Sequence, residues 1–384
     1  MNSRQRVEAS IAHKPVDKVP LGFYAVDYDT AEKVLGRPTF IRNKIALQLA
    51  FWEGRRDEVA ESLKIDTVEF YRKIDCADLI LGKEAQAIPP KNYDPDPPKK
   101  IAENKWQDRF GRIYQASYEA NEIACIYDPV EEQKTYSESD FAGPVEVPPF
   151  DDSEYEVFDH FVRIFGKEKY IASFTGGITA LNQCGGLEGF TQKSLLMYIL
   201  QPEVVLASNR YLVKLQNELD KFHIRPGVAG LMTEQDMAGT NAPLISPQMF
   251  REFCLPFLKE RVAQIKKYAS QVILHNCGNN MPLMDMFIEC GIDCYQSLQT
   301  TAGMDLGILK QKWGKTMCFW GGVPVENLIG GTMDDVRKDV RRALKLGAPG
   351  GGFILGPSHS IAKSTKYDNF MAMLDEFVKL RDKF

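Results

Sequence analysis

The chain has 384 residues, and its 47 Lys and Arg against 52 Asp and Glu give a formal net charge of −5. Duplex nucleic acids are bound through basic side chains that release counterions from phosphate. An acidic chain with no run of more than two adjacent basic residues is therefore not expected to bind them. The hydrophobic share of 44% and the charged share of 26% are those of a globular protein, which excludes disorder over most of the length.

The N-terminus and the cysteines indicate the compartment. Met1–Arg6 leads into a polar, helix-like stretch without the apolar segment of a secretory signal. The eight cysteines are therefore expected to be reduced rather than to form a disulfide framework. No run of apolar residues approaches the length of a membrane helix. We expect a cytoplasmic protein that does not insert into a membrane.

Short apolar, β-branched runs bounded by Gly, Pro or Asp alternate with stretches of helical period along the whole chain. Parallel strands joined by helices have this pattern. The eight predicted strands are Val19–Phe23, Thr67–Tyr71, Tyr170–Phe174, Val228–Leu231, Gln271–Leu274, Cys294–Leu298, Met317–Trp320 and Gly352–Leu355. Eight such units in a chain of this length favour a single α/β domain over residues 1–384, a (β/α)8 TIM barrel with an N-terminal extension.

The region of residues 85–150 does not follow the alternation. Five prolines between Ile88 and Lys100 are incompatible with a helix or a central strand. After them, Trp106–Tyr114 and Ile123–Tyr127 are predicted to form an aromatic hairpin. We expect residues 85–150 to be a loop insertion over one mouth of the barrel, acting either as a lid or only as a solvated subdomain.

Helices are clearest in the last third of the chain. Pro247–Ala269 has apolar residues at helical spacing, with Ser246 as the predicted N-cap and Pro247 at the first helical position. Met333–Leu346 repeats this arrangement with Thr332 as the N-cap. The amphipathic stretch Asn369–Leu380 is predicted to complete the outer ring of helices.

Functional groups of a barrel gather at the carboxyl ends of its strands. The candidate functional residues are therefore those that follow the last five predicted strands. They are Glu234, Gln235 and Asp236; His275, Asn276, Cys277, Gly278 and Asn279; Gln299; Gly321 and Gly322; and Pro357, Ser358 and His359. Two of the five histidines in the chain are in this set.

His275 and Cys277 are one residue apart and precede Gly278, which permits a sharp turn. Imidazole and thiolate are preferred zinc ligands, and a catalytic zinc site needs three protein ligands and an open position. His359, after the eighth strand, is the candidate for the third ligand. The alternative is that His275 and Cys277 are chance neighbours and that the thiol is merely buried.

The two carboxylates after the fourth strand, Asp236 and Glu234, are candidates for a further ligand, a partner that orients a ligating histidine, or a general acid or base. Equally, they could cap or salt-bridge the loop. Candidates for contacts to a cofactor are Asn276, Gly278, Gln299 and Gly322.

Six segments of the chain together resemble the uroporphyrinogen decarboxylase superfamily of (β/α)8 barrels. These segments are Arg4–Pro20, Pro243–Phe253, His275–Asn279, Gly303–Leu306, Trp320–Val323 and Gly351–His359. The resemblance implies a TIM barrel and an enzyme of this superfamily.

Two segments of the sequence indicate the branch of the superfamily. Uroporphyrinogen decarboxylases carry an Arg-Gln-Ala-Gly-Arg-Tyr segment after the first strand, whereas this chain has Phe23–Tyr28 there, without an arginine. The His-x-Cys pair is instead similar to the zinc site of corrinoid-dependent methyltransferases such as methylcobamide:coenzyme M methyltransferase. That resemblance implies His275 and Cys277 as ligands. Where this branch has a third, cysteine ligand the chain has Ser358-His359, so either His359 substitutes or zinc is weakly bound or absent.

The resemblance implies zinc-assisted methyl transfer between a corrinoid and a small thiol, amine or methoxy compound, including O-demethylation. The chain has no Asp-x-His-x-x-Gly segment, so methylcobalamin or a related corrinoid is expected on a separate partner protein. A homodimer is expected from the resemblance alone.

The sequence leaves two alternatives open. One is a metal-free decarboxylase of uroporphyrinogen or a smaller acid, in which Asp236 and His359 transfer protons. The other is a protein that binds a corrinoid or tetrapyrrole without turnover.

Overall fold

The computed structural model describes residues 1–130, 135–176 and 192–384, and within them the strands of the main sheet are all parallel. Their order along the sheet is β1-β2-β7-β8-β9-β10-β11-β12, which is also their order in the sequence. Their bounds are Gly22–Phe23, Leu79–Ile80, Tyr170–Thr175, Gly230–Glu234, Val272–His275, Cys294–Gln296, Cys318–Val323 and Phe353–Pro357. The predicted TIM-barrel architecture is confirmed.

The ring closes between the first and the last strand. Leu21 forms a parallel bridge with Leu355, and the Leu355 amide donates a hydrogen bond to the Pro20 carbonyl at 2.9 Å. Inside the ring, the buried Trp320 indole donates to the Gly22 carbonyl at 3.1 Å. A Cβ on Gly22 would lie 2.7 Å from the indole nitrogen, so only glycine leaves room for this ring.

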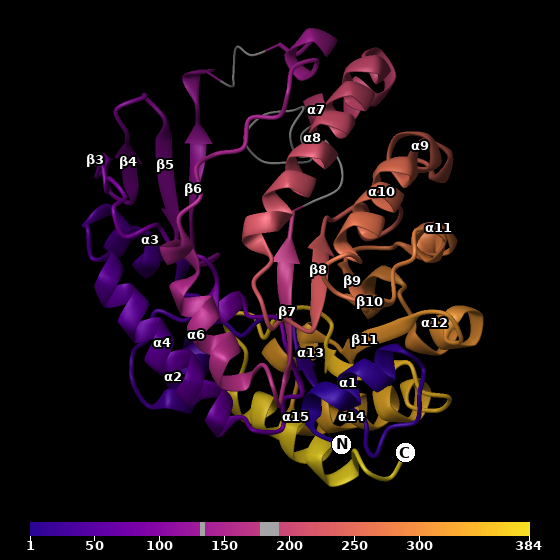
Figure 1. Ribbon diagram of the computed structural model, residues 1–384. Helices are drawn as coiled ribbons and strands as arrows, with labels where there is room; N and C mark the ends of the chain where they lie inside the picture. Colours follow the sequence, from indigo (N-terminus) through magenta and orange to yellow (C-terminus); the bar gives the residue numbers. More distant parts are fainter. Residues whose placement is uncertain (131–134, 177–191) are drawn as a thin grey trace.

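Helices surround the sheet (Figure 1). Those described are α1 (Ser3–Ile11), α2 (Tyr28–Leu35), α3 (Lys44–Trp52), α4 (Arg56–Lys73), α6 (Glu156–Phe165), α7 (Gln192–Leu200), α8 (Pro202–His223), α9 (Pro247–Phe253), α10 (Leu255–Ile265), α11 (Met284–Glu289), α12 (Leu306–Trp313), α13 (Val325–Ile329), α14 (Met333–Gly347) and α15 (Tyr367–Leu380). Short 3-10 turns include η1 (Lys83–Ala85), which directly follows β2. Both chain termini lie at the end of the barrel opposite to that toward which β7 and β8 point.

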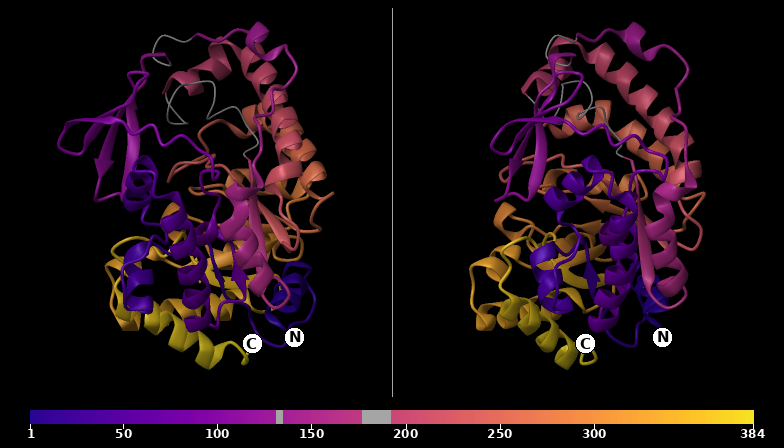
Figure 2. Two further views of the ribbon diagram at one scale, coloured as in Figure 1. Left: turned by 60° about the vertical axis from the view of Figure 1, so that its left-hand side comes forward. Right: turned by 90° about the vertical axis from the view of Figure 1, so that its left-hand side faces the viewer.

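A second, antiparallel sheet follows the proline-rich stretch. Its strands are β3 (Lys99–Ala102), β4 (Lys105–Gln107), β5 (Ile113–Ser117) and β6 (Glu122–Tyr127), in that order. It stands on the side toward which β7 and β8 point, and Figure 2 shows it from two further directions. The Trp52 ring of α3 packs against Trp106 and Tyr114, with ring centroids 5.5 and 5.7 Å apart. The prediction of one hairpin arm at Trp106–Tyr114 is wrong, because this stretch contains β4, a turn and the start of β5, whereas the second predicted arm, Ile123–Tyr127, lies in β6. The action of this sheet as a lid stays a prediction.

The prediction of a strand at Thr67–Tyr71 is wrong. These residues lie in α4, and the second barrel strand is Leu79–Ile80. The run is rich in β-branched and aromatic residues, but its buried positions extend a helical period that begins at Val59 and Leu63. Two-residue strands such as β2 carry almost no periodic signal, so the neighbouring strands define them rather than their own sequence.

The predicted helix Pro247–Ala269 is two helices, α9 and α10, because the chain breaks at Cys254 ahead of Pro256. The predicted caps are confirmed: Ser246 accepts from the Met249 amide, and Thr332 accepts from the Asp335 amide.

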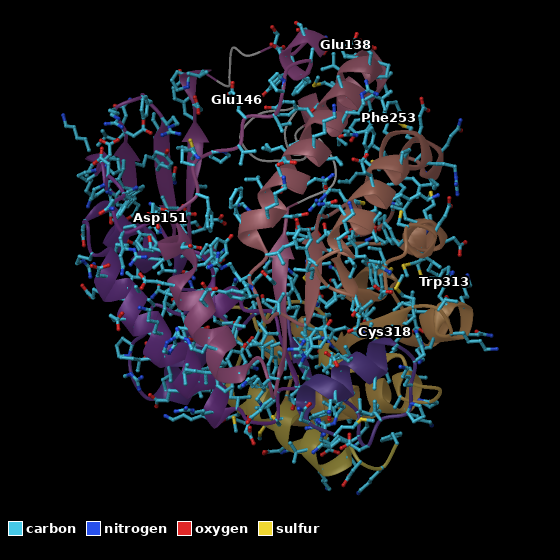
Figure 3. All side chains as sticks on the ribbon, in the orientation of Figure 1. Glu138, Glu146, Asp151, Phe253, Trp313 and Cys318 are labelled. Atoms are coloured by element: carbon cyan, nitrogen blue, oxygen red, sulfur yellow. The ribbon has the colours of Figure 1, made fainter. Side chains whose placement is uncertain are left out.

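The described cysteines form no disulfide with one another. Among them Cys318 lies at the start of β11, labelled with Trp313 of α12 in Figure 3. Trp313 donates its indole hydrogen to Asp285 at 2.6 Å.

None of the described helices is both long and apolar enough to span a membrane.

Candidate metal centre

Three side chains that the sequence singled out meet at the carboxyl ends of β9 and β12. His275 is the last residue of β9, Cys277 follows two residues later, and His359 follows the end of β12. One ligand atom from each of the three lies within 4.8 Å of the others. Two strands separate β9 from β12 in the sheet, so closure of the ring is what brings these loops together.

The turn after β9 depends on Gly278. Its φ is +83°, and a Cβ there would lie 2.3 Å from the Ala238 carbonyl oxygen. Two neighbouring loops hold the turn: Asp236 accepts from the Cys277 amide at 2.7 Å, and Gln299 accepts from the Gly278 amide at 3.0 Å. In this structure Asp236 and Gln299 therefore position the backbone that carries Cys277.

Asn276 is fully buried beneath the same turn. Its Oδ1 accepts from the Met237 amide and from Asn280, both at 2.9 Å. Its Nδ2 has no hydrogen-bond partner among the described residues. Asn276 thus joins the loops after β8 and β9, and its contact with a cofactor stays a prediction.

Each imidazole uses its Nδ1 atom for a hydrogen bond within the protein. His275 Nδ1 donates to Gln296, the last residue of β10, and His359 Nδ1 lies 3.0 Å from the Ser360 hydroxyl. Occupation of Nδ1 leaves Nε2 of both rings for a cation, which is the arrangement of histidine ligands in metal sites. His275 Nε2 lies 3.5 Å from the Cys277 sulfur and 3.9 Å from Asp236.

The Cys277 sulfur rests against Ser297. The Ser297 hydroxyl lies 3.3 Å from Sγ and donates to the Ser358 carbonyl at 2.9 Å. Ser297 has a φ of +87°, a conformation that non-glycine residues adopt rarely. The Ser358 hydroxyl instead accepts from the Val325 amide at 3.0 Å, so His359, not Ser358, joins the cluster.

Burial sets the protonation of the three groups. It lowers the pKa of His275, and together with the nearby His275 it lowers the pKa of His359 to about 4. Burial, and then Asp236, raises the pKa of the Cys277 thiol to about 12. At neutral pH the site holds two neutral imidazoles and a thiol, which is a donor set that a divalent cation binds with release of one proton.

Glu234, the last residue of β8, belongs to a neighbouring group. It accepts from the Tyr24 hydroxyl and pairs with Lys83 at 2.9 Å. The Tyr24 ring stacks on the His275 ring with centroids 4.1 Å apart and an interplanar angle of 14°. The Lys83 ammonium lies 3.9 Å from the centroid of the same Tyr24 ring, and burial lowers the pKa of Lys83. Tyr24 therefore connects this ion pair with His275.

Sequence reasoning missed Tyr24, Lys83 and Gln296. Tyr24 directly follows β1, so the criterion that selected residues after the last five strands identifies Tyr24 when it is applied to the first strand. The sequence did not indicate Lys83, because Lys83 follows β2 and the second strand was predicted at Thr67–Tyr71 instead. Gln296 lies inside the predicted sixth strand, where a polar side chain gives no sign of what it faces.

Gly322 lies within β11 rather than after it. A Cβ there would lie 2.9 Å from the Ala343 side chain of α14, on the helix side of the strand. Its contact with a cofactor stays a prediction.

The fold and the site define a parallel α/β barrel with a His/Cys/His donor cluster at the carboxyl ends of its strands. A methyltransferase from Methanosarcina mazei has a similar structure, with a TM-score of 0.66 at 15% identity over 99% of each chain. A protein from Bacteroides thetaiotaomicron described as an α-L-fucosidase, and a GH10 endoxylanase from a sugarcane soil metagenome, match with TM-scores of 0.32 and 0.24, which are too low to indicate a shared fold. No curated protein matches the sequence significantly.

The family model for uroporphyrinogen decarboxylase (URO-D) matches residues 157–380, which is more than half of the chain. The protein belongs to the uroporphyrinogen decarboxylase family, as its sequence motifs indicated.

Proposed function

We propose that this protein is a zinc-assisted methyltransferase that moves a methyl group between a corrinoid and a small thiol, amine or methoxy compound. The observation that carries the proposal is the meeting of His275, Cys277 and His359 within 4.8 Å at the mouth of the barrel. The similar protein from Methanosarcina mazei is itself described as a methyltransferase.

The donor set suits zinc. Nitrogen and sulfur ligands are those that zinc prefers, and three protein ligands leave one position for a substrate. His359 takes the place of the cysteine that the methyltransferase branch has in the eighth-strand loop. Zinc bound there would supply Lewis acidity, which lowers the pKa of a bound thiol or polarises an ether oxygen.

The remaining residues of the site orient the proposed ligands and cover one of them. Gln296 fixes the His275 ring with Nε2 directed at the cluster, and Ser297 supports the Cys277 sulfur. Tyr24 covers one face of the His275 ring. Asp236 and Gln299 hold the turn that carries Cys277. In the proposed reaction, these residues keep the donors in place while the methyl donor and acceptor bind above them.

The corrinoid is proposed to arrive on a separate protein, because the sequence has no corrinoid-binding segment of the Asp-x-His-x-x-Gly type. The side from which it would approach is the one toward which the strands point, since the donor cluster lies there.

Elemental analysis of the purified protein tests the proposal. We expect about one zinc per chain, lost on chelator treatment together with methyl transfer from methylcobalamin to a thiol, or from a methoxy compound to reduced cobalamin. Replacement His275→Ala should remove both, whereas His160→Ala on α6, outside the cluster, should change neither. A protein that holds only traces of zinc, and in which His275→Ala leaves methyl transfer intact, would contradict the proposal.

A further inference from the structure

A cavity of about 580 Å³ lies at the other end of the barrel from the candidate metal centre. The end of α6 and the loop between α8 and β8 line it. Lys167 and Gly227 in its wall shortly precede β7 and β8, so the cavity lies at the amino ends of these strands. In Figure 1 this is the end at which the chain termini lie. A ligand bound there would not touch the His/Cys/His cluster, which lies at the carboxyl ends of the strands.

Positive side chains dominate the wall of this cavity. Arg4, Arg163, Lys167 and Arg225 line it, and Asp159 is the acidic residue found among the lining residues of the described chain. A concave surface lined mostly by one sign of charge concentrates ligands of the opposite sign. The distribution of partners among the four cations decides which of them can bind such a ligand.

Arg225 is held by carboxylates of its own. It binds both oxygens of Asp159, at 2.9 and 2.6 Å, and its third nitrogen lies 2.8 Å from Asp152. Its hydrogen-bonding capacity is therefore largely used within the protein.

Arg4 is fixed across the cavity wall. It pairs with Glu8 at 2.9 Å, and its Nη1 atom donates to the Gly166 and Gly227 carbonyls at 2.7 and 3.2 Å. The printed contacts of Arg4 use Nε and Nη1, so Nη2 remains for a ligand. Arg4 also covers the Gly166 carbonyl, which would otherwise repel an anion at the end of α6.

Arg163 and Lys167 differ from these two arginines. Both are exposed, and the ion pairs and side-chain hydrogen bonds found in the described parts of the chain do not include either of them. They are four positions apart, and Gly166 continues the helical conformation beyond α6 with φ −64° and ψ −16°. Like charges at this spacing share one face and repel each other. An anion between them would replace this repulsion by attraction.

The start of α1 adds to the positive potential. Asn2, the N-cap of α1, donates from its side-chain amide to the Lys167 carbonyl at 3.2 Å, and the Arg4 amide donates to the Glu168 carbonyl at 2.8 Å. The N-terminal end of α1 therefore abuts the segment that carries Lys167. Helix N-termini carry a partial positive charge and favour nearby anions.

We infer that this cavity binds the phosphate group of a small molecule through Arg163 and Lys167. A phosphate monoester has about two negative charges at neutral pH and three acceptor oxygens, which suits two unpaired cations and a neighbouring guanidinium. The planar guanidinium of Arg163 matches phosphate geometry, and Lys167 supplies a point charge. A carboxylate, with a single charge, would balance only one of the two. Cavities of this size enclose whole small molecules, so an organic part can accompany the phosphate.

Calorimetry on the intact protein tests the inference with three probes at equal ionic strength: inorganic phosphate, glycerol 3-phosphate and acetate. We expect both phosphate compounds to bind at least about tenfold more tightly than acetate, because each offers one more charge-assisted contact. Their affinity should fall as salt rises. Tighter binding of glycerol 3-phosphate than of inorganic phosphate would assign the site to a phosphorylated compound, and the reverse order to free phosphate.

Variants assign the contacts. Arg163→Gln and Lys167→Gln should each weaken the binding of both phosphate compounds about tenfold. Arg72→Gln is the matched control, because Arg72 is an exposed arginine in the last turn of α4, as Arg163 is in the last turn of α6, and does not line the cavity. Thermal unfolding without phosphate should be the same in Arg163→Gln and Arg72→Gln, which shows that the loss of binding is not a loss of fold.

The inference is overturned if acetate binds as tightly as the phosphate compounds, or if Arg163→Gln and Arg72→Gln have the same affinity for them. It does not rest on the proposed function. Zinc content and methyl transfer should be unchanged in Arg163→Gln, since the donor cluster lies at the other end of the barrel.

Discussion

Gln296 shows how one side chain on a neighbouring strand prepares a ligand. Gln296 and His275 are register partners on β10 and β9, so the amide oxygen meets Nδ1 of the ring directly. The Gln296 Nε2 atom has no partner among the described residues, although it is buried. A buried amide group without a partner costs free energy, about 1–3 kcal/mol. That cost is consistent with a side chain kept for the orientation of His275.

We predict that Gln296→Ala weakens zinc binding about 10-fold to 100-fold, the usual effect of removing the partner of a ligating histidine. The reason is that the His275 ring loses its fixed tautomer and orientation. Competition with a chromophoric chelator measures the affinity. The control is Gln115→Ala on β5, an exposed position outside the barrel sheet. Equal zinc affinity in Gln296→Ala and the parent protein would count against a role for Gln296 at the site.

At the scale of elements, Glu156 ties α6 to α4. It binds Arg56 and lies 2.8 Å from the Lys64 ammonium, and Arg56 and Lys64 are both largely buried. Burial opposes ionisation of Glu156, but its hydrogen bonds to Lys64 and Arg56 outweigh burial and lower its pKa. The packing of the two helices therefore depends on a charged Glu156.

This lowered pKa predicts a pH dependence of stability. A carboxyl with a pKa lower in the folded state stabilises the protein above its unfolded value of about 4.3, and this contribution is lost as pH falls through the folded pKa. Glu156→Gln should therefore be less stable than the parent at pH 7, with a difference that shrinks below about pH 4.3. Urea unfolding at several pH values measures this.

Glu103→Gln, on the exposed turn between β3 and β4, serves as the control for Glu156→Gln and should show no such convergence. A difference between Glu156→Gln and the parent that stays constant from pH 7 to acid pH would refute the ion-pair explanation.

At the scale of the whole molecule, Asp78 joins both ends of the chain to the barrel. It binds Arg6 of α1 at 2.6 Å and Arg381 just after α15. The three side chains are 2% to 8% exposed. One buried carboxylate thus pairs with two buried guanidinium groups, and the Arg6 guanidinium has a second partner in Asp17 at 2.7 Å. The helices α1 and α15, which these arginines tie to the barrel, lie near the chain termini (Figure 1).

Asp78→Asn should destabilise the protein by about 3–5 kcal/mol, because removing one partner leaves buried charge without compensation. Chemical denaturation measures the loss. Asp75→Asn is a closely matched control three residues earlier, since the Asp75 side chain is 90% exposed and should cost little. Similar stabilities of the two variants would show that Asp78 does not tie the termini to the barrel.

The sequence determined those features whose signal is local. Strands β7 to β12 were predicted close to their observed positions because each is a run of apolar residues bounded by turn residues. His275, Cys277, Asp236 and Glu234 could be predicted as candidates because strand ends of a barrel share one face. The caps Ser246 and Thr332 likewise depend only on residues within one helical turn.

The contacts that depend on closure of the ring could be determined only from the tertiary structure. The strand β2 is defined by its neighbours β1 and β7, and with it the place of Lys83. Closure also brings His359 to His275 and Cys277, as its place after the eighth strand predicted, and stacks Tyr24 from the first strand on His275, which the sequence did not indicate. The physical reason is that these contacts join residues tens to hundreds of positions apart. Their geometry follows from the packing of the whole barrel, and a short stretch of sequence does not determine it.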